Sequence, residues 1–245
     1  MKIPPEHLRI RLYGSFKDPD VWIEVGLYSF HRLRDAYHIE SHHKIIDLGC
    51  GCGRLVLPLI SFLDSSKGGA YYGLDVDKEM MDWCAINFNY SNFHFMWADV
   101  KNSLYFRTGQ LSDALYKFPY EDNLLDFGCA FSLFTHLLEA GSVNYLNETS
   151  RVLKPNGKLM FSCFLFDDIT EANIAAGKSA WTFKYNDTER CRYDIQNSPD
   201  CTVGYTLKGM QDMITNSGLK LVSIIKGNWS EVPNGSHDEV LVEKI

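Results

Sequence analysis

A loop of alternating glycines is the feature that most constrains this chain. The apolar segment Ile45-Ile46-Asp47-Leu48 has the character of a buried strand, and it leads into Gly49-Cys50-Gly51-Cys52-Gly53 before a helical stretch. Glycine permits the positive φ angles of a tight turn and lets a ligand approach the backbone closely. The N-terminus of the helix that follows offers unpaired N–H groups. The pattern therefore predicts a cofactor site, since a turn that only packs a strand against a helix needs one glycine.

The spacing of these glycines narrows the choice of cofactor. It is G-x-G-x-G, which differs from the G-x-G-x-x-G of dinucleotide-binding loops, and no Lys-Ser or Lys-Thr pair follows as in a P-loop. This disfavours a diphosphate ligand. Asp75 ends the next predicted strand, where doubly wound folds place an acid against ribose hydroxyls, and Asp77 is the competing candidate. Asp99 closes the third predicted strand, from which a carboxylate can accept a hydrogen bond from an adenine amino group.

Short apolar segments alternate with helical patterns along the chain. This alternation predicts a parallel sheet covered by helices, and uniformly apolar strands suit burial on both faces. The last two segments have no helix between them, so we expect an antiparallel hairpin. The expected strands are 44–48, 70–74, 93–97, 125–131, 158–164, 220–225 and 239–244. The expected helices are 54–63, 78–87, 140–153 and 205–217, the first of them kinked by Pro58.

We expect one domain over residues 1–245, because no linker-like run of Pro, Gly or Ser and no internal repeat divides the chain. The segments 105–123 and 167–204 fit no element of the sheet, and long insertions of this kind tend to carry function. We expect the insertion and the N-terminal segment to cover the substrate. The expected parts are an N-terminal helical segment (1–43), a cofactor-binding core (44–164), an insertion (165–205), and a last helix with a C-terminal hairpin (206–245).

Composition argues against several classes of protein. A formal net charge of −7 gives no electrostatic footprint for nucleic acid or an anionic membrane surface. The N-terminus lacks an apolar signal segment, and the apolar runs are too short to span a membrane, so we expect a cytoplasmic protein. The seven cysteines are scattered and odd in number, and no second Cys or His pair completes zinc-ligand spacing. We expect neither a disulfide framework nor a metal site.

The motifs resemble those of the class I S-adenosylmethionine-dependent methyltransferases over almost the whole chain. Asp47 to Gly53 is similar to the first motif of that family, Leu74 to Asp77 to the second, and Ala98-Asp99-Val100 to the third. The segment from Arg151 to Leu159 resembles the helix–turn–strand segment that usually ends in Pro-Gly-Gly. Asn156 replaces one of those glycines, which is tolerable because Asn adopts a left-handed backbone readily.

This resemblance implies a fold, a cofactor and a set of cofactor residues. The fold is α/β and Rossmann-like, with a doubly wound, seven-stranded sheet that is mostly parallel and has an antiparallel last strand. The cofactor is S-adenosylmethionine, and the product is S-adenosylhomocysteine. The methionine end is expected over the glycine loop, the ribose at Asp75 and the adenine beside Asp99. The implied cofactor-binding residues are Asp47, Gly49, Gly51, Gly53, Asp75, Val76, Ala98, Asp99, Val100 and Phe131.

The residues after the fourth strand are expected to face the methyl acceptor. They read Ser132-Leu133-Phe134-Thr135-His136, which is neither the Asn/Asp-Pro-Pro-aromatic motif of enzymes that methylate nucleobase amines nor the Pro-Cys of cytosine-C5 enzymes. With the two ends of the chain, including Gly227-Asn228-Trp229 and Asp238 to Val242, this stretch is similar to bacterial small-molecule methyltransferases, which often serve natural-product or sugar-modification pathways. The candidate substrate-binding aromatics are Tyr13, Phe134, Trp181 and Tyr185.

His136 is the candidate general base, because a histidine pKa near neutrality suits proton removal from a hydroxyl. The alternative is a histidine that packs or caps at the start of a helix. The predicted activity is methyl transfer to a hydroxyl of a small molecule. An amine, carboxyl or peptide acceptor remains an alternative, as do a non-catalytic S-adenosylmethionine-binding protein and a nicotinamide oxidoreductase. Neither the identity of the acceptor nor the oligomeric state follows from the sequence.

Overall fold

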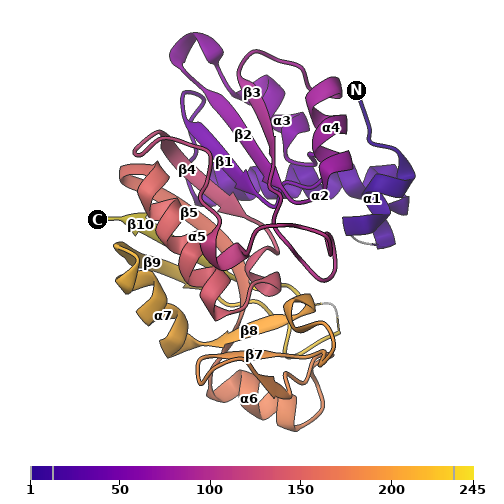
Figure 1. Ribbon diagram of the computed structural model, residues 1–245, viewed down its shortest axis with the longest axis vertical. Coiled ribbons are helices and arrows are strands. Elements are labelled where there is room, and N and C mark those ends of the chain that lie inside the picture. Colours follow the sequence, from indigo (N-terminus) through magenta and orange to yellow (C-terminus); the bar gives the residue numbers. More distant parts are fainter. Residues whose placement is uncertain (1, 13, 234) are drawn as a thin grey trace. The chain divides into compact units, whose positions relative to one another are not determined.

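The computed structural model describes residues 2–12, 14–233 and 235–245, and Figure 1 labels its elements. The chain divides into two compact units. The first comprises Met1–Asp99 and Leu125–Cys129, and the second comprises Val100–Leu124 and Ala130–Ile245. The organisation as a single domain stays a prediction.

The first unit holds a parallel sheet with the strand order β3-β2-β1-β4. All residues of β1 after Lys44 are buried, as a strand covered on both faces requires. The strands are β1 (Lys44–Leu48), β2 (Ala70–Asp75), β3 (Phe93–Trp97) and β4 (Leu125–Ala130). The helices are α1 (Glu6–Leu12), α2 (Pro19–His31), α3 (Val56–Phe62) and α4 (Lys78–Asn87), with the short turns η1 (Gly14–Lys17), η2 (Arg32–Ala36) and η3 (Ser65–Lys67).

The expected kink at Pro58 was wrong, because the helix begins later than expected. The first residue of α3 is Val56, which places Pro58 in the first turn. Backbone N–H groups of a first turn have no partner within the helix, so proline removes no hydrogen bond there.

The second unit is built around the long strand β5 (Leu153–Phe166). The last strand, β10 (Asp238–Lys244), lies antiparallel to both β5 and β9 (Leu219–Ile225), which confirms the predicted C-terminal hairpin. The helices are α5 (Glu139–Val152), α6 (Asp168–Ala175) and α7 (Leu207–Asn216), with the turns η4 (Asp113–Leu115), η5 (Phe134–His136) and η6 (Pro199–Cys201). Asn156 adopts φ 66°, the left-handed backbone expected at this turn. All seven predicted strands are present, and the α/β, Rossmann-like class is confirmed.

The insertion is more regular than the sequence predicted. Besides α6 it contains the short strands β6 (Tyr185–Asn186), β7 (Cys191–Tyr193) and β8 (Val203–Thr206). Strand β8 pairs in parallel with the carboxyl end of β5, between Phe164 and Phe166, and β7 pairs antiparallel with β8. Figure 1 shows α6, β7 and β8 together at one end of this unit. The sequence did not predict these strands, because two to four residues are too few to show an alternation of apolar and polar side chains.

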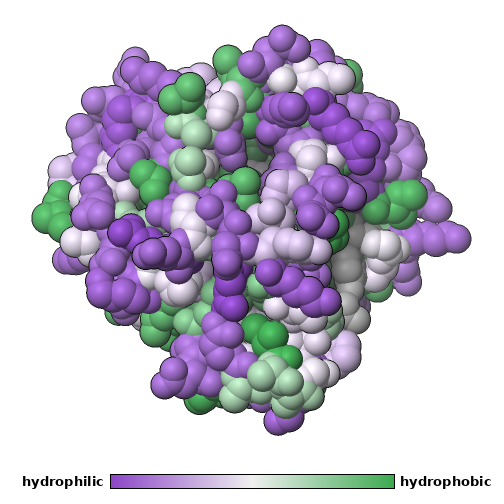
Figure 2. Space-filling model, turned by 60° about the horizontal axis from the view of Figure 1, so that its bottom comes forward, coloured by the Kyte–Doolittle hydropathy of each residue, from purple (hydrophilic) through white to green (hydrophobic). Residues whose placement is uncertain are grey.

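No helix within the described ranges is both long and apolar enough to cross a membrane. On the face drawn in Figure 2, hydrophobic side chains are scattered among hydrophilic ones and form no broad apolar patch.

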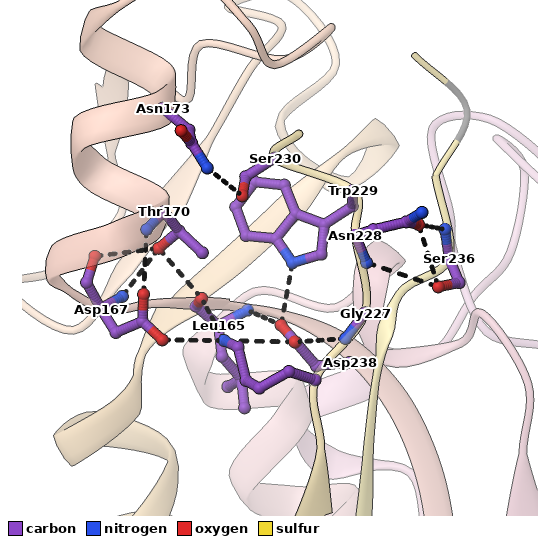
Figure 3. Close-up of polar contacts among 11 residues, drawn as sticks. Leu165, Asp167, Thr170, Asn173, Gly227, Asn228, Trp229, Ser230, Ser236 and Asp238 are labelled. Atoms are coloured by element: carbon purple, nitrogen blue, oxygen red, sulfur yellow. Dashed lines mark hydrogen bonds and ion pairs between the residues drawn. The ribbon is translucent and has the colours of Figure 1, made fainter. Parts of the chain in front are cut away.

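A buried carboxylate fixes the loop between β9 and β10 in the second unit. Asp238 is fully buried and accepts hydrogen bonds from the backbone N–H of Leu165 at 2.9 Å, the indole N–H of Trp229 at 2.9 Å and the backbone N–H of Gly227 at 3.0 Å (Figure 3). Lys226 lies 3.2 Å from the same carboxylate. A buried charge is tolerated when it is paired and fully hydrogen-bonded in this way. The sequence analysis singled out two segments here, Gly227-Asn228-Trp229 and the one that starts at Asp238. The structure joins them through the hydrogen bonds of Gly227 and Trp229 to Asp238.

Removing this carboxylate should destabilise the protein strongly. In Asp238→Ala, Lys226 and three N–H groups lose their buried acceptor, so we expect a loss of about 3–5 kcal/mol in the free energy of unfolding. Urea denaturation followed by circular dichroism measures it. Asp82→Ala, which removes an exposed ion pair with Lys78, is the matched control and should change stability by less than about 1 kcal/mol. Equal effects of the two substitutions would contradict the structural role of Asp238.

Candidate functional site

The glycine loop closes over the carboxyl end of β2 within the first unit. Gly49, Gly51 and Gly53 have φ angles of 74°, 54° and 81°, so each uses the left-handed region that favours glycine. The N–H groups of Gly49 and Cys50 donate to the carbonyl of Leu74, at 2.8 and 3.2 Å. A Cβ added at Gly51 would come within 2.8 Å of the Leu12 side chain. The positive φ angles therefore require glycine in this loop, and the Leu12 side chain packs against the backbone of Gly51.

Asp75 ties this loop to β2. Its carboxylate accepts the N–H of Gly51 at 2.7 Å through one oxygen and the N–H of Asp77 at 2.9 Å through the other. Burial raises the pKa of Asp75, and the two backbone N–H groups oppose that rise because they favour the charged form. Each carboxylate oxygen keeps a second lone pair, so the group can accept further hydrogen bonds from two vicinal hydroxyls. The residues present therefore fit the ribose of S-adenosylmethionine.

Asp77, the competing candidate for the ribose, is already engaged. Its carboxylate caps the N-terminus of α4 by accepting the N–H of Met80 at 3.1 Å, and it also accepts a hydrogen bond from Arg11 at 2.9 Å. Arg11 belongs to α1 and also binds Glu79, so α1 is held to the start of α4 by charge. These contacts give Asp77 a structural role and favour Asp75 for the ribose.

Asp47 supplies a second buried carboxylate before the loop. The hydroxyl of Tyr71 donates to it at 2.8 Å, and burial raises the pKa of Asp47 to about 6. The charge of the buried Arg54 guanidinium counteracts that rise. A cationic ligand group near Asp47 would further favour its charged form. The amino group at the methionine end of S-adenosylmethionine has this charge.

The remaining cofactor candidates follow β2 and β3. The N–H of Ala98 donates to the carbonyl of Asp75 at 2.8 Å, and the indole of Trp97 donates to the carbonyl of Val76 at 2.9 Å. Asp99 follows directly and is half-buried. The structure thus brings Asp47, the three glycines, Asp75, Val76, Ala98 and Asp99 to the carboxyl ends of neighbouring strands in one unit. Val100 and Phe131 belong to the second unit, where Val100 is buried and pairs with Leu111.

The cysteines beside the glycine loop are packing residues. All seven cysteines are free thiols. Burial raises the pKa of Cys52 to about 12, and Cys50 contacts the sulfur of Met81 at 3.8 Å. A thiol with such a high pKa is a poor ligand and nucleophile at neutral pH. Within the described ranges, no three His, Cys, Asp or Glu side chains gather as a metal site.

In the second unit, the backbone of η6 orients His136. Nδ1 of His136 lies 3.2 Å from the carbonyl oxygen of Asp200. A carbonyl only accepts hydrogen bonds, so Nδ1 carries the proton and Nε2 of the neutral ring carries the lone pair. Burial lowers the pKa of His136 below its ordinary 6.5, and the backbone and charge of Asp200 oppose that shift. The edge of Tyr105 packs against the ring, with centroids 5.4 Å apart.

Tyr205 of β8 holds the turn that carries His136. Its buried hydroxyl lies 2.9 Å from the carbonyl oxygen of Phe134 and also hydrogen-bonds to the carbonyl of Leu137. Because the hydroxyl proton of Tyr205 goes to a carbonyl, the hydroxyl of Ser142, 2.7 Å away, donates to Tyr205. The insertion therefore clamps η5 through a side chain of β8 and a carbonyl of η6. Sequence reasoning missed Tyr205, which looks like an ordinary strand aromatic.

A second histidine, His237, lies close to His136 and was also missed. Burial, together with the charge of His136, lowers the pKa of His237 to about 4. Nδ1 of His237 is 3.5 Å from the hydroxyl of Ser132, and its ring packs edge-on against Phe164 at 4.5 Å. His237 precedes β10, far along the chain from the motif after β4. The sequence offered one clue to His237: it directly precedes Asp238, the first residue of a segment that the sequence analysis had named.

The predicted substrate-binding aromatics occupy different places. Phe134 is fully buried, and its ring packs 4.3 Å from that of Phe161, so the structure places it in the core and not on an open wall. Trp181 is half-buried and packs against Phe164, the ring that also contacts His237. Tyr185 stacks on Tyr193 within the small β6–β7 pair. Tyr13 lies outside the described residues.

Comparison with known proteins identifies the family. Residues 46–161, which include the glycine loop, the ends of β2 and β3 and the turn after β4, match the family model described as "Methyltransferase domain". The matched segment, just under half of the chain, is a methyltransferase domain, and the chain is similar to the class I S-adenosylmethionine-dependent methyltransferases. S-adenosylmethionine is the methyl donor in this family.

Individual relatives of this methyltransferase are distant. The chain is 24% identical to methyltransferase GfsG of Streptomyces halstedii over 169 residues, which are 66% of this chain and 55% of that protein. It thus spans about half the length of that curated relative. A solved S-adenosylmethionine-dependent methyltransferase from Aquifex aeolicus shares the fold with a TM-score of 0.55 and 16% identity, covering 93% of this chain and 99% of that one. A second, from Methanosarcina mazei, has a TM-score of 0.56 and 17% identity, covering 86% and 96%.

Substitution of Asp75 tests the cofactor site of the methyltransferase. Asp75→Ala removes the acceptor for two ribose hydroxyls and for the N–H of Gly51, so calorimetry should show S-adenosylhomocysteine binding roughly ten- to a hundredfold more weakly. Asp77→Ala is the matched control. It removes a helix cap and should lower stability by about 0.5–2 kcal/mol while affinity stays near the parental value. If affinity depended on Asp77 and not on Asp75, the ribose assignment would be overturned.

Proposed function

We propose that this chain transfers a methyl group from S-adenosylmethionine to a hydroxyl of a small molecule, with His136 as the general base. The observation that carries the proposal is the hydrogen bond from Nδ1 of His136 to the carbonyl of Asp200. This bond orients the ring and leaves Nε2 as the basic nitrogen. Burial favours the neutral ring, which is the form that can take up a proton.

The place of His136 in the chain supports this role. The chain runs from β4 directly into η5, and the residues after the fourth strand border the sulfonium group in this family. When bound, S-adenosylmethionine supplies a methyl group on a positively charged sulfur. Nε2 of His136 takes the proton of the acceptor hydroxyl, and the oxygen forms its bond to the methyl carbon as the carbon–sulfur bond breaks. The electron pair of that bond would stay on sulfur, which would lose its positive charge, and the proton would remain on His136.

The electrostatics of the site favour a hydroxyl over a carboxylate. Burial lowers the pKa of both His136 and His237, so both rings are neutral at pH 7 and neither offers a positive charge to an anionic acceptor. A neutral amine needs no base and would be methylated through alignment alone. A hydroxyl has a high pKa and needs a base to remove its proton. A neutral histidine that is held in place, with its lone pair on a defined nitrogen, can act as that base. The acceptor itself belongs to a natural-product or sugar-modification pathway in this proposal.

The pH dependence of the rate tests the role of His136. Because the base acts in its neutral form, the rate should rise with pH through a pKa below 6.5 and be constant above it. The groups that bear on this titration are Asp200, Tyr105 and His237. In His136→Ala the rate should fall about a hundred- to ten-thousandfold and the rising limb should vanish, while the affinity for S-adenosylhomocysteine stays the same.

Product formation is measured by mass spectrometry with a pool of hydroxyl-, amine- and carboxyl-bearing acceptors. His136→Gln is the companion variant, since it keeps a polar side chain of similar length without a base. A parental rate in both variants with a true acceptor would show that His136 is structural. If only an amine or only a carboxylate were methylated, that group, and not a hydroxyl, would be the acceptor.

A further inference from the structure

The position of His237 is fixed by the structure around it. Its neighbour Asp238 is anchored by Leu165, Gly227 and the indole of Trp229, as Figure 3 shows, so the backbone at the start of β10 is held on three sides. Trp229 is itself fully buried against Phe164, with ring centroids 5.0 Å apart. His237 therefore stands on a rigid support, as a residue that binds a ligand with defined geometry requires.

Ser132, the partner of His237, is held in a strained conformation. Its φ angle is 61°, a left-handed backbone that serine rarely adopts. The N–H of Ser132 donates to the hydroxyl of Ser162 at 2.7 Å, and its carbonyl accepts the hydroxyl of Thr135 at 2.7 Å. These two bonds keep the strained turn in place directly after β4. As a result the Ser132 hydroxyl points toward His237.

The hydrogen-bonding capacity of His237 is not used up by the fold. In the described part of the chain, its one hydrogen-bond partner is Ser132, at the long distance of 3.5 Å. His237 is half-buried, so part of the residue remains exposed. The titratable groups that bear on it are His136, which in its protonated form would disfavour protonation of His237, and Asp238, whose carboxylate is engaged by other donors. His237 thus offers a neutral imidazole with one nitrogen available to a ligand.

Phe164 gives this polar pair an apolar setting. Its ring packs edge-on against His237 at 4.5 Å and also contacts Trp181 at 4.8 Å. Phe164 itself is buried, whereas Trp181 is half-buried, so the exposed part of the Trp181 ring is the apolar surface that favours a rigid hydrocarbon frame over a charged or highly hydrated ligand. The surroundings of His237 therefore combine one neutral polar pair with aromatic rings.

We propose that His237 and Ser132 bind a second hydroxyl of the acceptor, next to the one that is methylated at His136. The substrate class is an uncharged molecule with two neighbouring hydroxyls on an apolar frame. This inference rests on the proposed function, since it assigns the reacting hydroxyl to His136. His237 is then a residue that determines specificity, and His136 remains the base.

Catechol and phenol provide a matched pair of probes that differ by one neighbouring hydroxyl. With the full chain saturated with S-adenosylhomocysteine, we expect the parent protein to bind catechol at least about tenfold more tightly than phenol by calorimetry, because one additional well-placed hydrogen bond is worth roughly that factor. His237→Phe keeps an aromatic ring and should abolish the preference. His237→Gln and Ser132→Ala should leave part of it, because each retains one hydrogen-bonding group of the pair.

His42→Gln, at an exposed histidine of the first unit, is the control and should keep the full preference. Unchanged affinity for S-adenosylhomocysteine shows that each variant is folded. Equal affinity of the parent for the two probes, no binding of catechol, or a preference that survives in His237→Phe would overturn the proposal. The measurement involves no methyl transfer, so its outcome is separate from that of the proposed function.

Discussion

The bond between the N–H of Gly51 and the carboxylate of Asp75 is the constraint on which the cofactor half depends. It joins the loop after β1 to the end of β2, and it does so with a carboxylate that burial would otherwise push towards its neutral form. The three left-handed glycines make this contact possible, because the loop needs positive φ angles that other residues rarely adopt. Loop and strand end are therefore specified together, and we propose that this one local arrangement binds the ribose and methionine ends of the cofactor.

The acceptor half is organised differently, by contacts between segments far apart in the chain. Tyr205 and the carbonyl of Asp200 clamp the turn that carries His136, and both come from the insertion. The Asp238 network anchors the start of β10 and with it His237. In this half the positions of His136 and His237 depend on the buried side chains of Tyr205 in β8 and Asp238 in β10. Neither of these two side chains has to contact the substrate.

Much of the fold was predictable because its signals are local. Apolar segments indicated all seven strands, with bounds close to the observed ones except for β5, which is longer at both ends, and Asn156 and the glycines were recognisable as left-handed positions. The strands of the insertion were missed because two to four residues carry no period. The kink at Pro58 was wrongly expected because helix starts are uncertain by a residue or two. The proposed cofactor residues of the first unit follow from the same local motifs, and their roles stay a prediction. His237 and Tyr205 were not predicted, because only tertiary structure brings them to His136.

The central claim is that the glycine loop with Asp75 selects S-adenosylmethionine and not a dinucleotide. Calorimetry of the full chain with S-adenosylhomocysteine and, separately, with NAD tests it most directly. We expect saturable binding of S-adenosylhomocysteine at one site per chain, with NAD neither binding nor competing. Binding of NAD with no binding of S-adenosylhomocysteine would contradict it.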